Sequence, residues 1–151
     1  MIDYIKLDLG DIKEIKELWE KLSKHHKEKS VDFKHIFEKV TFDIRIISYL
    51  NKVKKGKYSI DVVVDSDKGV SIGYGMNSIS EENIGEVDSI YIDPEYRGFG
   101  IGDELMRKAL LFFEENKAKK ILLGIAVGNE EVLEFYNKYG FKPRTIILEK
   151  K

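Results

Sequence analysis

The chain of 151 residues is close to the commonest domain size, and its 42% of hydrophobic residues suffice for one domain over residues 1–151. It contains no cysteine, which excludes disulfide frameworks, thiolate zinc sites, iron–sulfur clusters and cysteine-linked intermediates. The 26 basic and 27 acidic residues balance to a net charge of -1 and no long apolar run is present, so we expect a soluble, cytoplasmic protein that binds neither nucleic acid nor a membrane.

The first third of the chain predicts one short strand and two helices. Ile2–Leu7 has the alternation of a strand, and Asp11–Lys24 places its apolar residues at helical spacing. The polar run SKHHKEKS that follows is expected to be a loop. A second helical stripe begins at Phe33 and continues less regularly to Leu50.

The middle of the chain changes to the period of strands. Tyr58–Asp65 and Val70–Ile79 are both strand-like, and the residues DSDKG between them suit a hairpin turn. A second turn, SEENIG, leads into the strand Glu86–Asp93. These strands are therefore predicted to form an antiparallel sheet.

The last third predicts a crossover unit. After a glycine-rich loop, an amphipathic helix precedes the apolar strand Lys120–Val127, which must then lie parallel to the earlier strand. A further helix begins at Asn129, a good N-cap, and ends at Gly140, and Thr145–Leu148 is predicted as a final strand. The fold class is α/β with a mixed sheet.

The glycine-rich loop Y-R-G-F-G-I-G-D-E-L has the composition of a phosphate site. Its three glycines alternate before a helix that has no Ser, Thr or Asn to cap its first turn, so the helix amides lack a partner. With Arg97 beside them, they could bind a pyrophosphate, although a tight strand-to-helix turn with an exposed arginine also explains the spacing. The Gly-Lys-Ser/Thr of a P-loop and the G-x-G-x-x-G of a dinucleotide site are both absent.

Two motifs resemble those of the GCN5-related N-acetyltransferases, the GNAT family. The loop matches R/Q-x-x-G-x-G/A, and Asn129 through Phe141 is similar to N-x-x-A-x-x-F-Y-x-x-x-G-F, with Val132 or Leu133 in place of the small residue. The resemblance implies a GNAT-like mixed central sheet, with antiparallel N-terminal strands, a parallel crossover with a splayed strand pair, and about four flanking helices.

The resemblance also implies acetyl-CoA as the cosubstrate. Its pantetheine would pair with the backbone of Ile90 and Ile92, in a slot made where a β-bulge parts the strand at Asp88–Ile92 from Ile121–Val127. The cofactor-binding residues expected in full are Ile90, Ile92, Arg97, Gly98, Phe99, Gly100, Ile101, Gly102, Asn129 and Tyr136. Asp103 near the phosphates is unusual for the family, so we expect weaker pyrophosphate binding or a side chain turned outward.

For catalysis the resemblance implies Tyr136 as the acid that protonates the departing thiolate, although a core aromatic is the alternative interpretation. An alkylamine of pKa near 10.4 must lose a proton before it attacks, and Glu86 is our first choice for the base, with Asp88 second. Both could instead be ordinary surface carboxylates. Without cysteine we expect direct attack in a ternary complex, and no metal is required.

The acceptor is expected to be a primary amine of a small molecule or peptide. Acidic residues outnumber basic ones after Lys57, which favours a cationic amine. The alternative is a non-catalytic acyl-CoA sensor or interaction module of the same fold, and either could be a monomer or a homodimer. We expect His25, His26 and His35 to face solvent rather than to bind a metal.

Overall fold

The computed structural model describes residues 1–151 and contains one five-stranded sheet in the order β1-β2-β3-β4-β5. The first four strands are antiparallel to their neighbours, and β5 is parallel to β4. The strands are β1 (Ile2–Lys6), β2 (Lys57–Asp65), β3 (Val70–Ile79), β4 (Ile84–Ile92) and β5 (Lys120–Leu122).

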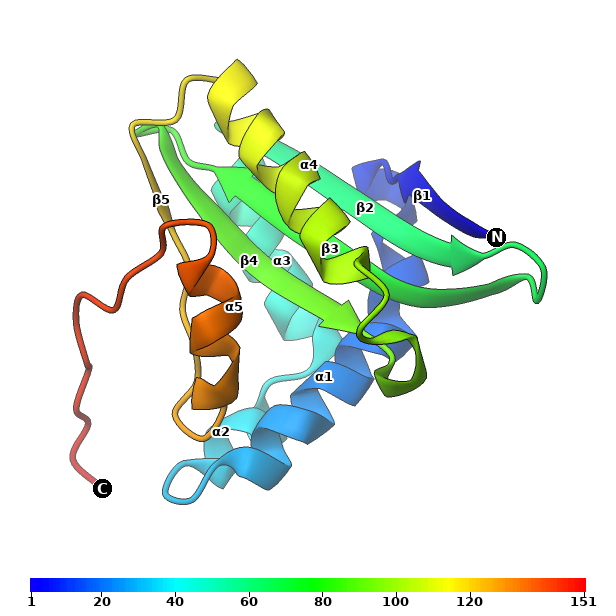
Figure 1. Ribbon diagram of the computed structural model, residues 1–151. Helices are drawn as coiled ribbons and strands as arrows, with labels where there is room; N and C mark the ends of the chain where they lie inside the picture. The colour runs from blue at the N-terminus through cyan, green and yellow to red at the C-terminus, as the bar shows by residue number, and fades with distance from the viewer.

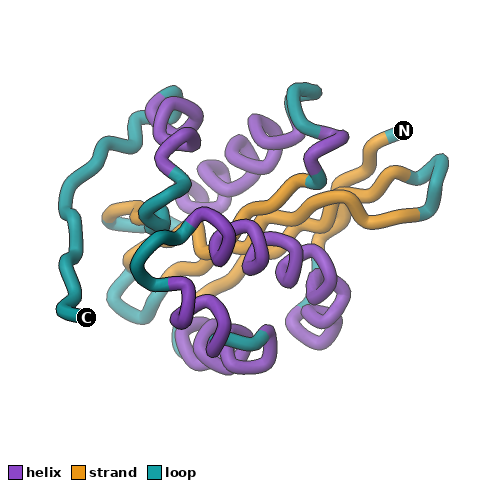
Figure 2. The backbone as a smooth tube through the Cα atoms, turned by 90° about the horizontal axis from the view of Figure 1, so that it is seen from below, coloured by secondary structure: helices purple, strands orange, loops and turns teal.

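Helices cover both faces of this sheet (Figure 1). Seen from below in Figure 2, the strands lie as a layer between helices on either side. The α-helices are α1 (Lys16–Lys29), α2 (Lys34–Lys39), α3 (Phe42–Val53), α4 (Ile101–Glu115) and α5 (Leu133–Asn137). Three short 3-10 helices are η1 (Leu9–Ile15), η2 (Pro94–Tyr96) and η3 (Glu130–Val132). None of the helices combines the length and the hydropathy that a membrane-spanning segment needs.

The larger core lies between the sheet and the pair α1 and α3. Trp19 of α1 packs edge-on against Phe42 of α3, with ring centroids 5.7 Å apart, and Tyr49 is fully buried in the same core. Burial of each such side chain stabilises the fold by about 1.5–3 kcal/mol. This core packs α3 against β3, and Arg45 and Lys52 of α3 also contact residues of β4, which matters for the site described below.

The opposite face of the sheet is covered by α4. Met106, Ala109 and Phe113 form the buried stripe of this helix and pack with Val87 of β4. Gly85 of β4 lies directly under the Phe113 ring, because a Cβ there would come within 2.8 Å of it. The β4–α4–β5 crossover therefore has a well-packed helix, as the sequence predicts.

The predicted hairpins are confirmed. β2 and β3 pair antiparallel around a turn that ends at Gly69, whose φ of +65° is the left-handed conformation that glycine adopts without strain. β3 and β4 pair antiparallel around a second turn in which Asn83 takes a φ of 66°. The strand between these turns, Val70–Ile79, has the predicted bounds.

The prediction of a loop at SKHHKEKS is wrong. α1 continues to Lys29, and the amide of Ser30 still donates to the carbonyl of His26. The run contains no Gly or Pro, so nothing in it stops a helix, and its Lys, Glu and His residues are tolerated on a helix surface. The second predicted helix is in fact two, α2 and α3, because Thr41 caps α3 by accepting from the amide of Ile44 at 3.2 Å.

Two predictions at the C-terminal end are wrong. The strand predicted over Lys120–Val127 ends at Leu122, and Thr145–Leu148 forms no strand. A strand needs a neighbour, and the early end of β5 leaves none beside the last residues. Ile146, Ile147 and Leu148 are consequently 79%, 88% and 90% exposed, and the tail runs along the outside of α5 (Figure 1).

Candidate active site

The loop between β4 and α4 presents a row of free backbone amides. None of the amides from Gly98 to Asp103 donates to another group of the protein, and the first amide in the row to find an acceptor is that of Glu104, which bonds Gly100. Gly98 and Gly100 have φ values of +83° and +80°, so the turn depends on glycine at both positions. Free amides at the positive end of a 15-residue helix are suited to bind an anion.

Asp103 is tied away from this row. Its Oδ1 accepts hydrogen bonds from the Tyr139 hydroxyl and, at 3.0 Å, from the Lys138 ammonium. These bonds hold the pKa of the Asp103 carboxyl below its usual range, and the bond from Tyr139 has the larger effect. The negative charge expected to weaken anion binding is therefore paired with Lys138.

β4 and β5 pair over only a short length before they separate. Only three residues of each strand pair, the last of them being Glu86 with Leu122. Beyond that point a bulge interrupts β4: Asn77 of β3 faces Val87, and its neighbour Met76 faces Ser89. Asp88 is the extra residue, and such a bulge bends the strand that carries it.

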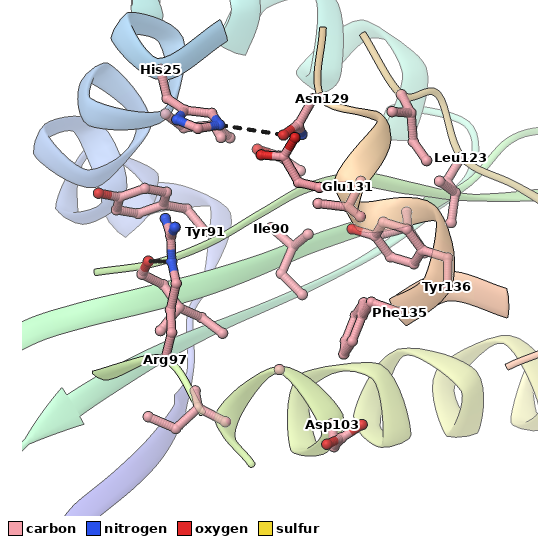
Figure 3. Close-up of a pocket in the computed structure, with 18 of the residues that line it drawn as sticks. His25, Ile90, Tyr91, Arg97, Asp103, Leu123, Asn129, Glu131, Phe135 and Tyr136 are labelled. Atoms are coloured by element: carbon pink, nitrogen blue, oxygen red, sulfur yellow. Dashed lines mark hydrogen bonds between the residues drawn. The ribbon is translucent and has the colours of Figure 1, made fainter. Parts of the chain in front are cut away.

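The gap between the separated strands is part of a cavity of about 540 Å³ (Figure 3). Its walls come from α1, from β4 and the following loop, from the segment after β5 and from α5. Of the ten cofactor-binding residues predicted, nine line this cavity: Ile90, Ile92, Arg97, Gly98, Gly100, Ile101, Gly102, Asn129 and Tyr136. The tenth, Phe99, is 77% exposed and does not line it.

Tyr136 points its hydroxyl into the cavity from α5 (Figure 3). The side chain is 8% exposed, and burial raises the pKa of the phenol to about 12. Its ring is held edge-on by Phe135 and Phe141, at centroid distances of 5.1 and 6.2 Å. The phenol is therefore protonated at neutral pH and can act as a proton donor.

Glu86 and Asp88 occupy different environments. Glu86, at the last paired position before the gap, is 40% exposed in its side chain and lies outside the cavity wall. Asp88 belongs to the wall, yet its side chain is completely buried, and this burial raises its pKa to about 6. Of these two carboxylates, only that of Glu86 can therefore be reached by solvent or a substrate. Both carboxylates are ion-paired with Lys52 of α3.

Arg97 and Asn129 are engaged by the protein. The Nε of Arg97 donates to the carbonyl of Ile92 at 2.9 Å, and its guanidinium lies 5.8 Å from the centre of the Tyr91 ring. Asn129 makes no side-chain cap at the start of η3, contrary to its predicted role as N-cap; its Oδ1 instead lies 3.3 Å from Nε2 of His25 (Figure 3).

The prediction that all three histidines face solvent is wrong for two of them. His25 and His26, expected to face solvent, lie on α1 and line the cavity, whereas His35 is exposed. Burial lowers the pKa of His26. The spacing from Leu22 could have indicated this position. In a helix that runs to Lys29, His25 and His26 follow Leu22 by three and four residues and therefore lie on the same face as Leu22.

The family comparison covers most of the chain. The sequence pattern described as "Acetyltransferase (GNAT) family" matches residues 16–141. An uncharacterized N-acetyltransferase of Methanocaldococcus jannaschii is 29% identical over 72 residues, which are 48% of this chain and 32% of that protein. The peptidyl-lysine N-acetyltransferase YjaB of Escherichia coli is 36% identical over 56 residues, 37% of this chain and 35% of the relative. The matches thus span about a third of the length of these two curated relatives.

Solved structures share the fold over nearly the whole chain. The PaiA N-acetyltransferase of Thermoplasma acidophilum, in complex with coenzyme A, superposes with a TM-score of 0.71, covering 94% of this chain and 90% of that chain. The two sequences are 20% identical, so the likeness is one of fold.

Proposed function

Because the chain belongs to the acetyltransferase (GNAT) family, we propose that it binds acetyl-CoA in the cavity between β4 and β5 and transfers the acetyl group to a primary amine. The observation that carries this proposal is the row of free amides from Gly98 to Asp103, placed at one end of a cavity that also contains the Tyr136 hydroxyl. An anion site and a proton donor in one cavity are what a thioester with a diphosphate group requires.

The donor would bind along the cavity. Its pyrophosphate would accept from the amides of Gly98 to Asp103, and its pantetheine amides would pair with backbone groups of Ile90 and Ile92, which β5 no longer reaches. The presence of coenzyme A in the Thermoplasma structure supports this choice of ligand. Acetyl-CoA would supply an activated thioester, and the chain would supply its position.

The reaction we propose is a direct transfer in a ternary complex. The amine nitrogen forms a bond to the acetyl carbon, and the bond from that carbon to sulfur breaks. Glu86 takes the proton that the amine loses, directly or through one water, and the Tyr136 hydroxyl gives a proton to the departing sulfur. The exposed carboxylate of Glu86 supports its role, whereas the buried side chain of Asp88 argues against Asp88 as the direct base.

The acceptor we propose is a primary amine carried by a peptide or a small molecule. The name of the Escherichia coli relative, a peptidyl-lysine N-acetyltransferase, supports a peptide amine. On the chain itself, Glu131 lines the cavity beside His25 and Asn129 (Figure 3). Its side chain is 59% exposed and only loosely paired with Lys29, at 4.0 Å, so its carboxylate favours an amine that arrives as a cation.

The test is a screen of primary amines with acetyl-CoA. Peptides with a free N-terminus, peptides with an internal lysine and polyamines are incubated with the protein, and thiol release is measured together with the mass gain of one acetyl group. We expect at least one class to gain the group. If coenzyme A binds and no amine is modified, the result favours the alternative, a non-catalytic acyl-CoA sensor or interaction module. If coenzyme A does not bind, the proposal fails at its first step.

A further inference from the structure

We propose that Lys52 and Asp88 are a pair of positioning residues that orient Glu86: buried Asp88 holds the Lys52 ammonium, and Lys52 holds the Glu86 carboxylate at the point where β4 leaves β5. The inference rests on the proposed function in one respect, namely that Glu86 receives the proton of the amine. The arrangement joins α3 to β4, and Lys52 is the one of its three residues that the sequence analysis did not single out.

The pair belongs to a row of contacts made by one face of α3. Arg45, Tyr49 and Lys52 are spaced four and three residues apart, so their side chains project from the same side of the helix. All of them reach the two strands at the bulge. The Tyr49 hydroxyl donates to the carbonyl of Asn77 on β3 at 2.6 Å, in a fully buried hydrogen bond.

Arg45 holds the backbone of the bulge. Its Nη2 donates to the carbonyl oxygen of Asp88 at 3.2 Å and lies 3.9 Å from the Asp88 carboxylate. A bulge leaves its extra residue without a partner in the ladder, and a buried carbonyl without a donor is costly. Arg45 supplies that donor, so the direction in which the Asp88 side chain leaves β4 is fixed from α3.

Lys52 lies between the two carboxylates. Its Nζ contacts Oδ1 of Asp88 and is 3.3 Å from Oε1 of Glu86. The Asp88 side chain is completely buried, whereas Glu86 is 40% exposed, so the ammonium connects an anchored carboxylate to an accessible one. A base that is oriented by a second group, itself held by a third, is a recurrent arrangement in catalytic sites.

The charge of the cluster is balanced. Burial is the main cause that raises the pKa of Asp88 to about 6, Lys52 opposes the rise, and the charge of Glu86 adds to it. The other groups that face Asp88 are Arg45 and Tyr49 from α3 and Ser78 from β3. Removal of Lys52 must therefore move the midpoint of the Asp88 titration to higher pH, and removal of the Glu86 charge must move it to lower pH.

The first experiment follows the Asp88 carboxyl carbon by NMR in ¹³C-labelled protein, and needs no acceptor amine. In Lys52→Met we expect the midpoint to rise by about one pH unit or more. In Glu86→Gln we expect it to fall. The matched control is Lys54→Met, which removes a lysine that forms no ion pair and should leave the midpoint unchanged. An unchanged midpoint in both test variants would overturn the pairing.

The second experiment is a double-mutant cycle on acetyl transfer to an amine found in the screen. Lys52→Met and Asp88→Asn should each lower kcat about tenfold or more with little change in the KM for acetyl-CoA, and the double variant should be no worse than either single one, because both break one chain of contacts. Lys52→Arg should restore part of the rate. Additive losses, or losses in KM alone, would contradict the inference.

The two experiments separate the possible failures. If no amine is acetylated while the NMR midpoints move as expected, the proposed function fails and the ionic chain stands. If acetylation occurs but Lys52→Met is fully active, the proposed function stands and the inference fails. Thermal unfolding of each variant shows whether it is folded, and Glu86→Gln leaves the buried pair intact should Lys52→Met prove unstable.

Discussion

Gly128 lies against the carbonyl oxygen of Lys29 so closely that a Cβ at position 128 would come within 2.2 Å of it. The contact joins the C-terminal end of α1 to the loop that carries Asn129. The hydrogen-bonding contact between His25 and Asn129 lies at the same junction. The end of α1 that was not predicted from the sequence is thus what closes this side of the cavity.

We therefore expect Gly128→Ala to destabilise the protein. The new methyl group would collide with backbone, and the φ of +103° at this position is unfavourable for alanine, so a loss of about 1–3 kcal/mol in the free energy of unfolding follows. Chemical denaturation measures it. Gly124→Ala is the control, because nothing lies within 4 Å of its Cβ position. Equal stability of the two variants would contradict the contact.

Coenzyme A should raise the melting temperature of the protein. At a ligand concentration one hundred times Kd the stabilisation is about 2.7 kcal/mol. Gly100→Glu should abolish the rise, because it places bulk and negative charge among the free amides. The φ of +80° at Gly100 strains any substitution, so the measured quantity is the ligand-induced change in Tm rather than Tm itself. Gly10→Glu, on an open surface elsewhere, should keep the rise.

Tyr136→Phe should reduce kcat by about 10²–10⁴-fold and leave the affinity for coenzyme A almost unchanged, because it removes a proton donor and keeps the ring. The pKa of about 12 means that the phenol stays protonated between pH 6 and 9, so the loss should be the same at every pH in that range. Steady-state rates over this range provide the measurement. A variant as active as the parent would exclude Tyr136 as the acid.

Glu86→Gln should lower kcat/KM for the amine by about 10²–10⁴-fold without weakening coenzyme A binding. The substitution keeps the size of the side chain and removes its ability to accept a proton. The companion variant is Glu82→Gln, a change of the same kind at an exposed position in the turn between β3 and β4. Should Glu86→Gln retain full activity, a water chain or another group removes the proton.

The sequence was sufficient for the loop and the strand that leads to it. Glycine alternation before an uncapped helix is a local property, so the free amides after Gly98 could be predicted without knowledge of the rest of the fold. The separation of β4 from β5 followed from the resemblance to a family, and the structure locates it just beyond Glu86. The hairpins were predictable because strand period and turn residues are also local.

What the sequence could not provide depends on distant contacts. Nothing in the local pattern of α3 indicates that Lys52 meets Asp88, 36 positions later, because that meeting depends on how α3 crosses the sheet. The polar composition after Leu22 is typical of a loop, but composition alone does not break a helix, so it does not show where α1 ends. Thr145–Leu148 has residues that favour a strand but forms none, because no sheet edge lies beside it to pair with.

Asp103 lies in the first turn of α4, and its bonds to Lys138 and Tyr139 reach the segment that follows Tyr136. These bonds link the loop that would bind the diphosphate to α5, the helix whose Tyr136 would protonate the sulfur. The two binding regions for the ends of acetyl-CoA are thus connected to each other. A movement of the start of α4 therefore affects the position of α5, and the reverse. The ion pair between Asp103 and Lys138 at the cavity would therefore resist movement of a bound thioester relative to the Tyr136 hydroxyl.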